Sequence, residues 1–265
     1  MPQSDPIDFW FSIGSLYTFL TVMRMDRVED TTDVRFVWRP FRIRTIMEEM
    51  NNLPGTQPRK LAYAFRDVHR RAALYGFAFE GQPPYPLANS DLANRVALIG
   101  AREGWCADYV RATYRRWFVE GEEAGSEPNL SDSLREIGED PARVLALAGT
   151  DSTARALDVA TDEARRLGIF GAPTFVARGE LFWGDDRLDD ADPRPLWQQL
   201  ADLLRGRIER GELAGRLEAE TALAQHYGVS RDTVRRALAV LAGDGLIRST
   251  RGRGTFVLPP GERGI

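Results

Sequence analysis

The first strand of this chain ends in a sharp turn that leads directly into a helix, and this junction limits the folds that the chain can adopt. Residues 7–11 alternate Ile and Phe with Asp and Trp, a pattern typical of a buried β-strand. Gly14 permits a tight turn, and Ser15 can cap a helix whose apolar residues recur at three- and four-residue spacing. The junction therefore places a hydroxyl on the first turn of a helix, where free N–H groups and the helix dipole favour an anion. The spacing alone favours the simpler interpretation, in which Ser15 is only an N-cap.

The charge of the chain is divided unevenly. Residues 1–193 hold 23 basic and 31 acidic side chains, a net charge of −8, whereas residues 194–265 hold 12 and 8, a net charge of +4. This asymmetry predicts two domains with different partners, the smaller one suited to a polyanion. We expect the domains to cover residues 1–190 and 191–265.

Cysteine and histidine are too scarce for several kinds of chemistry. Cys106 is the single cysteine, so an intrachain disulfide and the C-x-x-C motif of thiol-disulfide oxidoreductases are both excluded. One cysteine and two histidines also argue against a zinc centre, and we expect no metal. No stretch has the length of a membrane span and the N-terminus lacks a signal-peptide pattern, so we expect a cytoplasmic protein without a membrane partner.

Strand signals occur at the two ends of the first domain and helix signals between them. Residues 34–40 read as a second strand, and residues 45–168 read almost entirely as helix. Strand signals return at residues 174–176 and 181–183, separated by a hairpin turn at residues 178–180. This order predicts a thioredoxin-like α/β sheet interrupted by a helical insertion.

Several segments of the first domain together resemble one enzyme family. They are Ile7-Asp8-Phe9-Trp10-Phe11, Gly14-Ser15-Leu16-Tyr17, Trp38-Arg39-Pro40-Phe41, Asn51-Asn52-Leu53-Pro54, Gly171-Ala172-Pro173-Thr174-Phe175-Val176 and Trp183-Gly184-Asp185-Asp186-Arg187-Leu188. Residues 5–191 resemble the 2-hydroxychromene-2-carboxylate isomerases, relatives of the kappa-class glutathione transferases within the DsbA-like group. The resemblance implies glutathione as cofactor and the isomerisation of an aromatic-derived double bond through reversible addition of the glutathione thiolate.

The resemblance also implies roles for individual residues. Ser15 would hydrogen-bond the glutathione sulfur and, with the helix dipole, lower the pKa of the thiol. Ala172, ahead of a cis-proline at Pro173, would bind the cysteinyl backbone. Leu16 stands where many relatives have proline.

The γ-glutamyl end of glutathione would meet a different segment of the chain. The resemblance assigns this contact to Asp186 and Arg187. Asn51 or Asn52 would border the pocket, and the sequence does not choose between them.

The second domain reads as a helix-turn-helix followed by a two-stranded wing. Ser230 can cap a helix that shows Arg231 and Arg235 on one open face. Residues 246–250 and 255–258 flank a basic hairpin tip. The apolar residues expected to face inward are Leu200, Leu203, Leu204, Ile208, Leu223, Val234, Leu238 and Leu241.

Residues 195–258 resemble the winged-helix domain of GntR-family repressors. The matching segments are Pro-Leu-Trp-Gln-Gln-Leu, Gly-Val-Ser-Arg-Asp-Thr-Val-Arg-Arg-Ala-Leu, Gly-Leu-Ile and Arg-Gly-Arg-Gly-Thr-Phe-Val, in this order. The resemblance implies a homodimer on double-stranded DNA. It implies DNA contacts from Ser230, Arg231, Thr233, Arg235, Arg251, Gly252 and Arg253.

Two positions and the domain order depart from the GntR pattern. The family's L-P-S-E stretch is Leu217-Glu218-Ala219-Glu220 here, and Thr221 stands at a frequently basic position. The added acid and the missing cation both weaken the affinity for phosphate. GntR proteins also usually carry the DNA-binding domain first.

Three functional hypotheses follow. The chain is a one-component regulator that senses a glutathione-linked or small aromatic ligand, or a glutathione-dependent isomerase or transferase with an appended DNA-binding domain. In the third hypothesis neither site is fully active. The better preserved DNA-reading motif favours the regulator.

Overall fold

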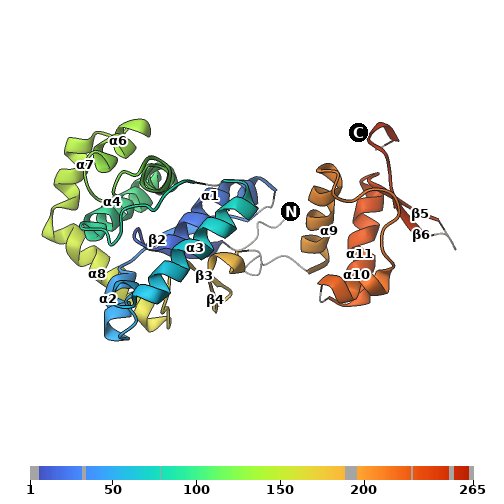
Figure 1. Ribbon diagram of the computed structural model, residues 1–265, viewed down its shortest axis with the longest axis horizontal. Helices are drawn as coiled ribbons and strands as arrows, with labels where there is room; N and C mark the ends of the chain where they lie inside the picture. The colour runs from blue at the N-terminus through green and yellow to red at the C-terminus, as the bar shows by residue number, and fades with distance from the viewer. Residues whose placement is uncertain are drawn as a thin grey trace. The chain divides into compact units, whose positions relative to one another are not determined.

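The computed structural model describes residues 6–31, 34–77, 79–188, 196–227, 229–250 and 254–262. They belong to two compact units, residues 1–191 and 192–265 (Figure 1). None of the described helices combines the length and the apolar composition that crossing a bilayer requires. The expected domain boundary at residues 190–191 and the predicted wing tip at residues 251–253 lie outside the described residues.

The first unit is built on a sheet whose described strands have the order β2-β1-β3-β4. β1 (Ile7–Phe11) pairs in parallel with β2 (Phe36–Pro40) and antiparallel with β3 (Thr174–Ala177), which pairs antiparallel with β4 (Glu180–Trp183). The predicted strands are therefore confirmed. The hairpin turn is shorter than predicted because Glu180 pairs with Ala177, which leaves Arg178 (φ 52°) and Gly179 (φ 80°) as a two-residue turn. Positive φ at both positions suits the strand twist.

The central strand β1 is buried on both faces of the sheet. Phe9 and Phe11 belong to the main core, where Phe9 stacks on Phe175 with ring centroids 5.4 Å apart. Trp10 faces the opposite way and packs with Phe41 and Ile46 in a second core. Burying each large side chain contributes about 2–3 kcal/mol, so this strand anchors the unit.

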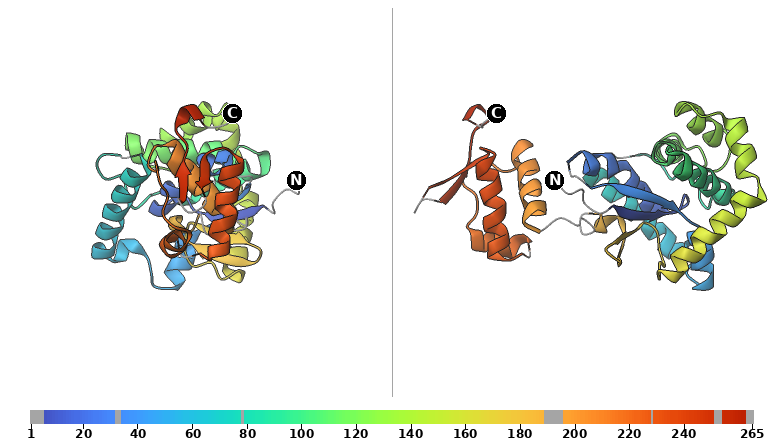
Figure 2. Two further views of the ribbon diagram at one scale, coloured as in Figure 1. Left: turned by 90° about the vertical axis from the view of Figure 1, so that its right-hand side faces the viewer. Right: turned by 180° about the vertical axis from the view of Figure 1, so that it is seen from behind.

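Helices α4 to α8 form most of the insertion between β2 and β3 (Figures 1 and 2). The Cys106 side chain lies in the core, and burial raises the pKa of its thiol above the ordinary value. Trp117 and Phe118 are buried in the same core. The helices of the unit are α1 (Leu16–Thr31), α2 (Ile43–Glu49), α3 (Pro58–Tyr75), α4 (Ser90–Glu103), α5 (Cys106–Arg115), α6 (Asn129–Glu136), α7 (Pro141–Ala148) and α8 (Asp151–Arg166), with short helical turns η1 (Pro54–Thr56), η2 (Arg116–Glu120) and η3 (Asp185–Arg187).

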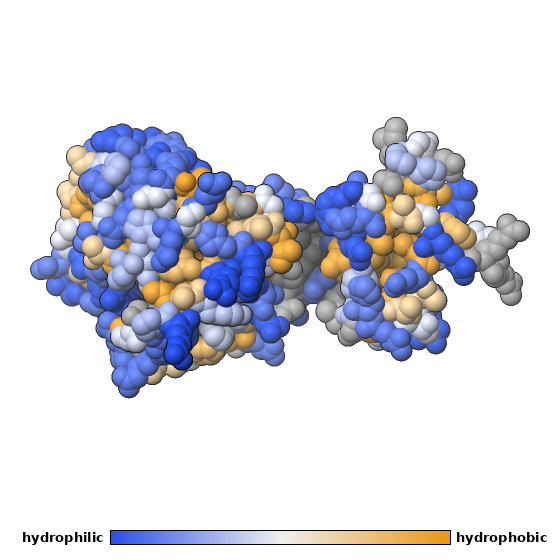
Figure 3. Space-filling view, viewed as in Figure 1, coloured by the Kyte–Doolittle hydropathy of each residue, from blue (hydrophilic) through white to orange (hydrophobic). Residues whose placement is uncertain are grey.

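The second unit packs three helices against a hairpin. The elements are α9 (Leu196–Glu209), α10 (Glu220–Tyr227), α11 (Arg231–Gly243), β5 (Ile247–Thr250), β6 (Gly254–Val257) and η4 (Pro260–Glu262). The predicted inward residues are buried except for Leu203, which is 47% exposed. At about 100° per residue, Leu203 lies roughly 110° from the middle of the stripe that α9 buries, so this prediction was wrong. Figure 3 shows apolar surface gathered over α9 and α11 on the viewed face of this unit.

A third extended segment, which the sequence analysis did not predict, joins the hairpin. Arg216 forms a bridge with Phe256, and its neighbours bond β6 through Leu217 N to Thr255 O (2.9 Å) and Val257 N to Gly215 O (2.8 Å). This segment fixes the hairpin to the chain that leads into α10.

Candidate functional site

Two buried side chains of the helical insertion hold the turn between β1 and α1. The Asn94 side chain accepts a hydrogen bond from Ile13 N (2.8 Å) and donates to Ile13 O (2.9 Å) and Ser90 O (2.7 Å). The Tyr114 hydroxyl lies within hydrogen-bond distance of Ser12 O (3.1 Å) and Ser15 O (3.0 Å). The insertion therefore fixes the backbone that presents Ser15.

Asn94→Ala is expected to lower the free energy of unfolding of the first unit by about 3 kcal/mol. The substitution leaves the buried N–H and carbonyl of Ile13 without their partner. Urea unfolding of the full chain would measure the change. Asn89→Ala is the matched control, because Asn89 is exposed at the start of the same helix. Equal losses in the two variants would contradict the expected role of Asn94.

Ser15 bonds the segment ahead of the predicted cis-proline. Its hydroxyl donates to Ala172 O at 2.7 Å and accepts from Thr18 N at 3.3 Å. The Ala172–Pro173 bond is cis, as predicted. Ser15 therefore caps α1 and, at the same time, joins the start of this helix to a backbone segment 157 residues away.

The segment Gly184–Arg187 lies beside the same proline. Gly184 N donates to Pro173 O at 3.0 Å. Gly184 has φ +121°, a backbone conformation that strongly favours glycine. Asp186 and Arg187 are both about half exposed, with Arg187 Nε 3.8 Å from Asp186 Oδ2. Direct bonds thus link Ser15, the cis-proline segment and the Asp186–Arg187 turn into one site.

A tyrosine follows Ser15 on the first turn of α1. The Tyr17 hydroxyl donates to Asp67 Oδ2 of α3 at 3.0 Å. Burial and this carboxylate raise the pKa of the phenol above its ordinary value. The bond ties the start of α1 to α3.

Asn51 and Asn52 lie in the turn after α2. Within the described residues, no hydrogen bond or ion pair connects either side chain to Ser15, Ala172 or Asp186. Asn51 has a left-handed backbone (φ 51°), and the Asn52 side chain bonds Lys60. Lys60 borders a surface hollow of about 490 Å³. Their place at the ligand pocket stays a prediction.

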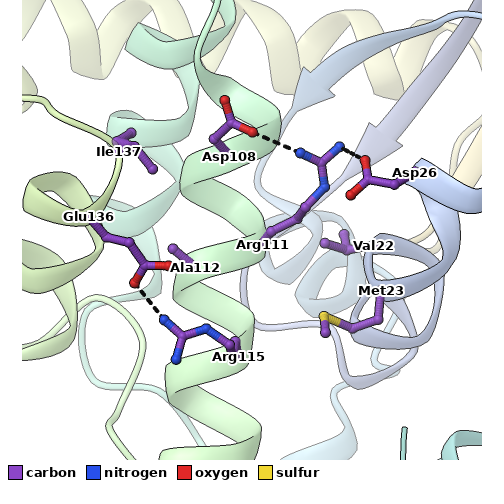
Figure 4. A pocket seen from close by; sticks show the side chains of 9 residues that line it. All are labelled: Val22, Met23, Asp26, Asp108, Arg111, Ala112, Arg115, Glu136 and Ile137. Carbon is purple, nitrogen blue, oxygen red and sulfur yellow. Dashed lines mark hydrogen bonds and ion pairs between the residues drawn. The ribbon is translucent and has the colours of Figure 1, made fainter. Parts of the chain in front are cut away.

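A second hollow, of about 460 Å³, lies between α1, α5 and α6 (Figure 4). Arg111 lies between Asp26 and Asp108 there, and Arg115 pairs with Glu136. Because each arginine already has a carboxylate partner, this hollow offers no uncompensated positive charge for an anionic ligand. Ser15 does not line it.

The predicted DNA-reading residues cluster at the start of α11 in the second unit. Ser230 accepts from Thr233 N at 3.1 Å, which confirms the predicted cap. Arg231 and Arg235 are exposed, whereas Val234 is fully buried. Arg235 lies 3.8 Å from Glu220 of α10. The helix pair α10–α11 has the arrangement of a helix-turn-helix with its arginines on the outer face.

The wing strands are confirmed as β5 and β6. Their described ends are Thr250 and Gly254, which pair directly. The predicted tip residues Arg251, Gly252 and Arg253 lie outside the described residues. Among the residues described, no group of three or more His, Cys, Asp or Glu side chains could hold a metal ion.

Two family models match the chain, and their matched ranges meet near residue 194. The model of the DSBA-like thioredoxin domain matches residues 6–193. The chain belongs to the DSBA-like thioredoxin family. The model of the bacterial regulatory proteins of the gntR family matches residues 196–257, so this DSBA-like protein carries a GntR winged-helix domain after its thioredoxin fold.

Known proteins resemble each part of this DSBA-like protein separately. A 2-hydroxychromene-2-carboxylate isomerase of Sphingobium xenophagum is 25% identical over 190 residues, 71% of this chain and 96% of that protein. The transcriptional repressor NagR of Bacillus subtilis (strain 168) is 39% identical over 75 residues, 28% of this chain and 31% of the repressor. The chain spans only about three tenths of the length of the regulators that it matches.

A solved structure shows the same fold as the first unit. It is a 2-hydroxychromene-2-carboxylate isomerase, aligned with a TM-score of 0.61 and 21% identity over 78% of this chain and 98% of that chain. The predicted thioredoxin-like sheet with a helical insertion is therefore confirmed.

The sequence analysis missed three polar residues of the DSBA-like domain: Asn94, Tyr114 and Asp185. An amide between Ala93 and Val96, on the apolar face of a predicted helix, was a signal for a buried polar contact. Tyr114 lies in a segment rich in aromatic residues, Tyr109, Trp117 and Phe118 among them, and gave no signal that distinguished it from them.

Proposed function

We propose that the chain is a GntR-type transcriptional regulator whose DSBA-like domain binds glutathione or a glutathione-linked aromatic compound as its effector. The observation that carries the proposal is the presence, in one chain, of a capped α11 with outward arginines and a bonded Ser15–cis-proline site. We further propose a cytoplasmic homodimer that binds a palindromic operator, because a two-fold symmetric reader matches two half-sites.

The chemistry of the site fits glutathione. Ser15 supplies a hydroxyl at a helix N-terminus for the sulfur, and the backbone of Ala172 lies beside it for a peptide group. Asp186 and Arg187 supply opposite charges for the amino and carboxylate groups of the γ-glutamyl end. To donate to a sulfur, Ser15 must turn its hydroxyl proton away from Ala172 O.

The proposal is tested with the full chain on double-stranded DNA. Selection from random duplexes would identify the preferred site, and binding at several salt concentrations would give its affinity and salt slope. We expect nanomolar affinity that falls steeply with salt. Glutathione at 1–10 mM is expected to change this affinity at least about fivefold, a coupling of roughly 1 kcal/mol. Equal affinity for all duplexes would refute the regulator, and no response to glutathione would refute the effector.

A second candidate is a glutathione-dependent isomerase with an accessory DNA-binding domain. The coverage of almost a whole 2-hydroxychromene-2-carboxylate isomerase supports it. Bound glutathione would supply a thiolate that adds reversibly to a conjugated double bond, while Ser15 and the start of α1 would hold the thiol ionised. Absorbance changes of a hydroxychromene carboxylate with protein and glutathione would test this candidate.

A further inference from the structure

A buried carboxylate lies directly next to the two residues assigned to the γ-glutamyl end. Asp185 is 1% exposed, whereas Asp186 and Arg187 are about half exposed. The three residues form the short turn η3, which follows strand β4 and Gly184. Contacts that fix Asp185 therefore also fix the positions of its two exposed neighbours.

Residues of two helices, α1 and α3, contact Asp185. Arg24 of α1 donates to the backbone carbonyl of Asp185 and lies 3.5 Å from its Oδ2. Arg71 of α3 lies 3.0 Å from the same Oδ2, and the Tyr75 hydroxyl of α3 lies 3.2 Å from it. Arg24 is itself placed over the ring of Tyr75, 4.0 Å from the centroid. The turn η3 is thus fixed to α1, the helix that begins next to Ser15, and to α3.

Among the described residues, only one oxygen of this carboxylate has side-chain partners. All the side-chain contacts go to Oδ2, and Oδ1 is buried with no hydrogen-bond partner among the described residues. Burial therefore raises the pKa of Asp185 to about 6, although Arg71, Arg24 and Tyr75 oppose this shift. The charged and titratable groups that face the carboxylate are these three residues and Asp186 of its own turn.

We propose that Asp185 is a positioning residue of the ligand site: its grip by Arg24, Arg71 and Tyr75 holds the exposed Asp186–Arg187 pair in the place where the γ-glutamyl end of glutathione binds. This inference rests on the proposed function. Asp185 is buried and does not contact the ligand itself, but it fixes the two neighbouring residues that do.

The direction of the pH effect follows from linkage. When the turn opens, Asp185 returns to water and to its ordinary pKa near 4, so the closed turn binds the proton more tightly than the open turn. The closed turn is therefore most stable at low pH and loses stability as pH rises from about 4 to about 6. Between pH 5 and 7.5 this linkage predicts roughly a tenfold fall in the protection of the turn against opening.

Hydrogen exchange and glutathione titration of the full chain test the inference together. Asp185→Ala removes the carboxylate contacts with Arg24, Arg71 and Tyr75 and keeps only the bond from Arg24 to the backbone carbonyl. We expect at least tenfold faster exchange at residues 184–188 and at least tenfold weaker glutathione binding at pH 7.5. Asp185→Asn keeps an acceptor for Arg71 and Tyr75 and is expected to stay within about threefold of the parent protein in both measurements. After correction for intrinsic exchange rates, protection of the turn in Asp185→Asn is expected to show no fall between pH 5 and 7.5.

His69→Gln is the control for pH, because His69 also lies on α3 but bonds Gly81 O and does not face Asp185. This variant is expected to keep the tenfold fall in protection. If Asp185→Ala does not fold, the pH response of Asp185→Asn alone decides.

Each outcome has a defined meaning. Unchanged exchange in Asp185→Ala, or an unchanged pH response in Asp185→Asn, would overturn the role of Asp185. Exchange could be faster in Asp185→Ala while the parent protein does not bind glutathione. This result would support the role of Asp185 in fixing the turn and overturn glutathione as the ligand.

Discussion

Replacing Arg231 and Arg235 together by alanine is expected to weaken binding to the selected duplex by at least about 100-fold at 100 mM salt. Both side chains are exposed on the outer face of α11, and each lost contact with a base or phosphate costs roughly 1–3 kcal/mol. If one of the two contacts phosphate, the slope of log affinity against log salt decreases by about 0.9. Fluorescence anisotropy with the selected duplex, over a salt series, would measure both quantities.

Arg210→Ala is the matched control for this pair. Arg210 belongs to the same unit, follows the end of α9 and pairs with Glu212, so its removal subtracts a positive charge without touching α11. We expect a change of less than about threefold. A loss in Arg210→Ala as large as in the double variant would mean that overall charge, and not the face of α11, determines affinity.

Ser15→Ala is expected to raise the thiol pKa of bound glutathione by about one to two units. A hydrogen bond to a charged group contributes roughly 1.5–3 kcal/mol, and one pKa unit corresponds to about 1.4 kcal/mol. Any isomerase turnover at neutral pH should fall about 10- to 100-fold with the loss of thiolate. Ultraviolet absorbance of the thiolate during a pH titration would follow the change directly.

The lost helix cap must be separated from the lost sulfur contact. Thr150 caps α8 through Thr153 N at 3.3 Å, the same distance at which Ser15 accepts from Thr18 N. Thr150→Ala should therefore cost a similar amount of stability, about 1 kcal/mol, and leave the thiol pKa of glutathione unchanged. The same thiol pKa in Ser15→Ala and the parent protein would contradict the assignment of Ser15.

Local chemistry explains why parts of the fold could be predicted from the sequence. The caps Ser15 and Ser230 bond residues only three positions further along the chain, so their sequence neighbourhood was sufficient. Strands such as β1 follow from alternation of side chains. The direction of Leu203 was wrong because Leu200, Leu203 and Leu204 all fit a three- to four-residue spacing, and only tertiary packing decides which of them is buried.

The site itself depended on contacts that no local pattern contains. Ser15 meets Ala172 across 157 residues, and Asn94 meets Ile13 across 81. The family resemblance indicated the first pair and gave no hint of the second. In the segment Asp185-Asp186, the resemblance assigned a role to Asp186, which is exposed. Only the structure shows that Asp185 is buried.

The pairing of β1 with β3 has a consequence for how a nascent chain acquires its structure. β1 leaves the ribosome well before its antiparallel neighbour, residues 174–177, so one edge of β1 stays unpaired while the residues between the two strands are synthesised. An apolar strand with an open edge is prone to pair with other chains. Early formation of the helices between residues 43 and 166 would cover the apolar faces of β1 until residues 174–177 are synthesised and pair with that edge. The winged-helix unit, whose strands are close in sequence, can form as soon as it emerges.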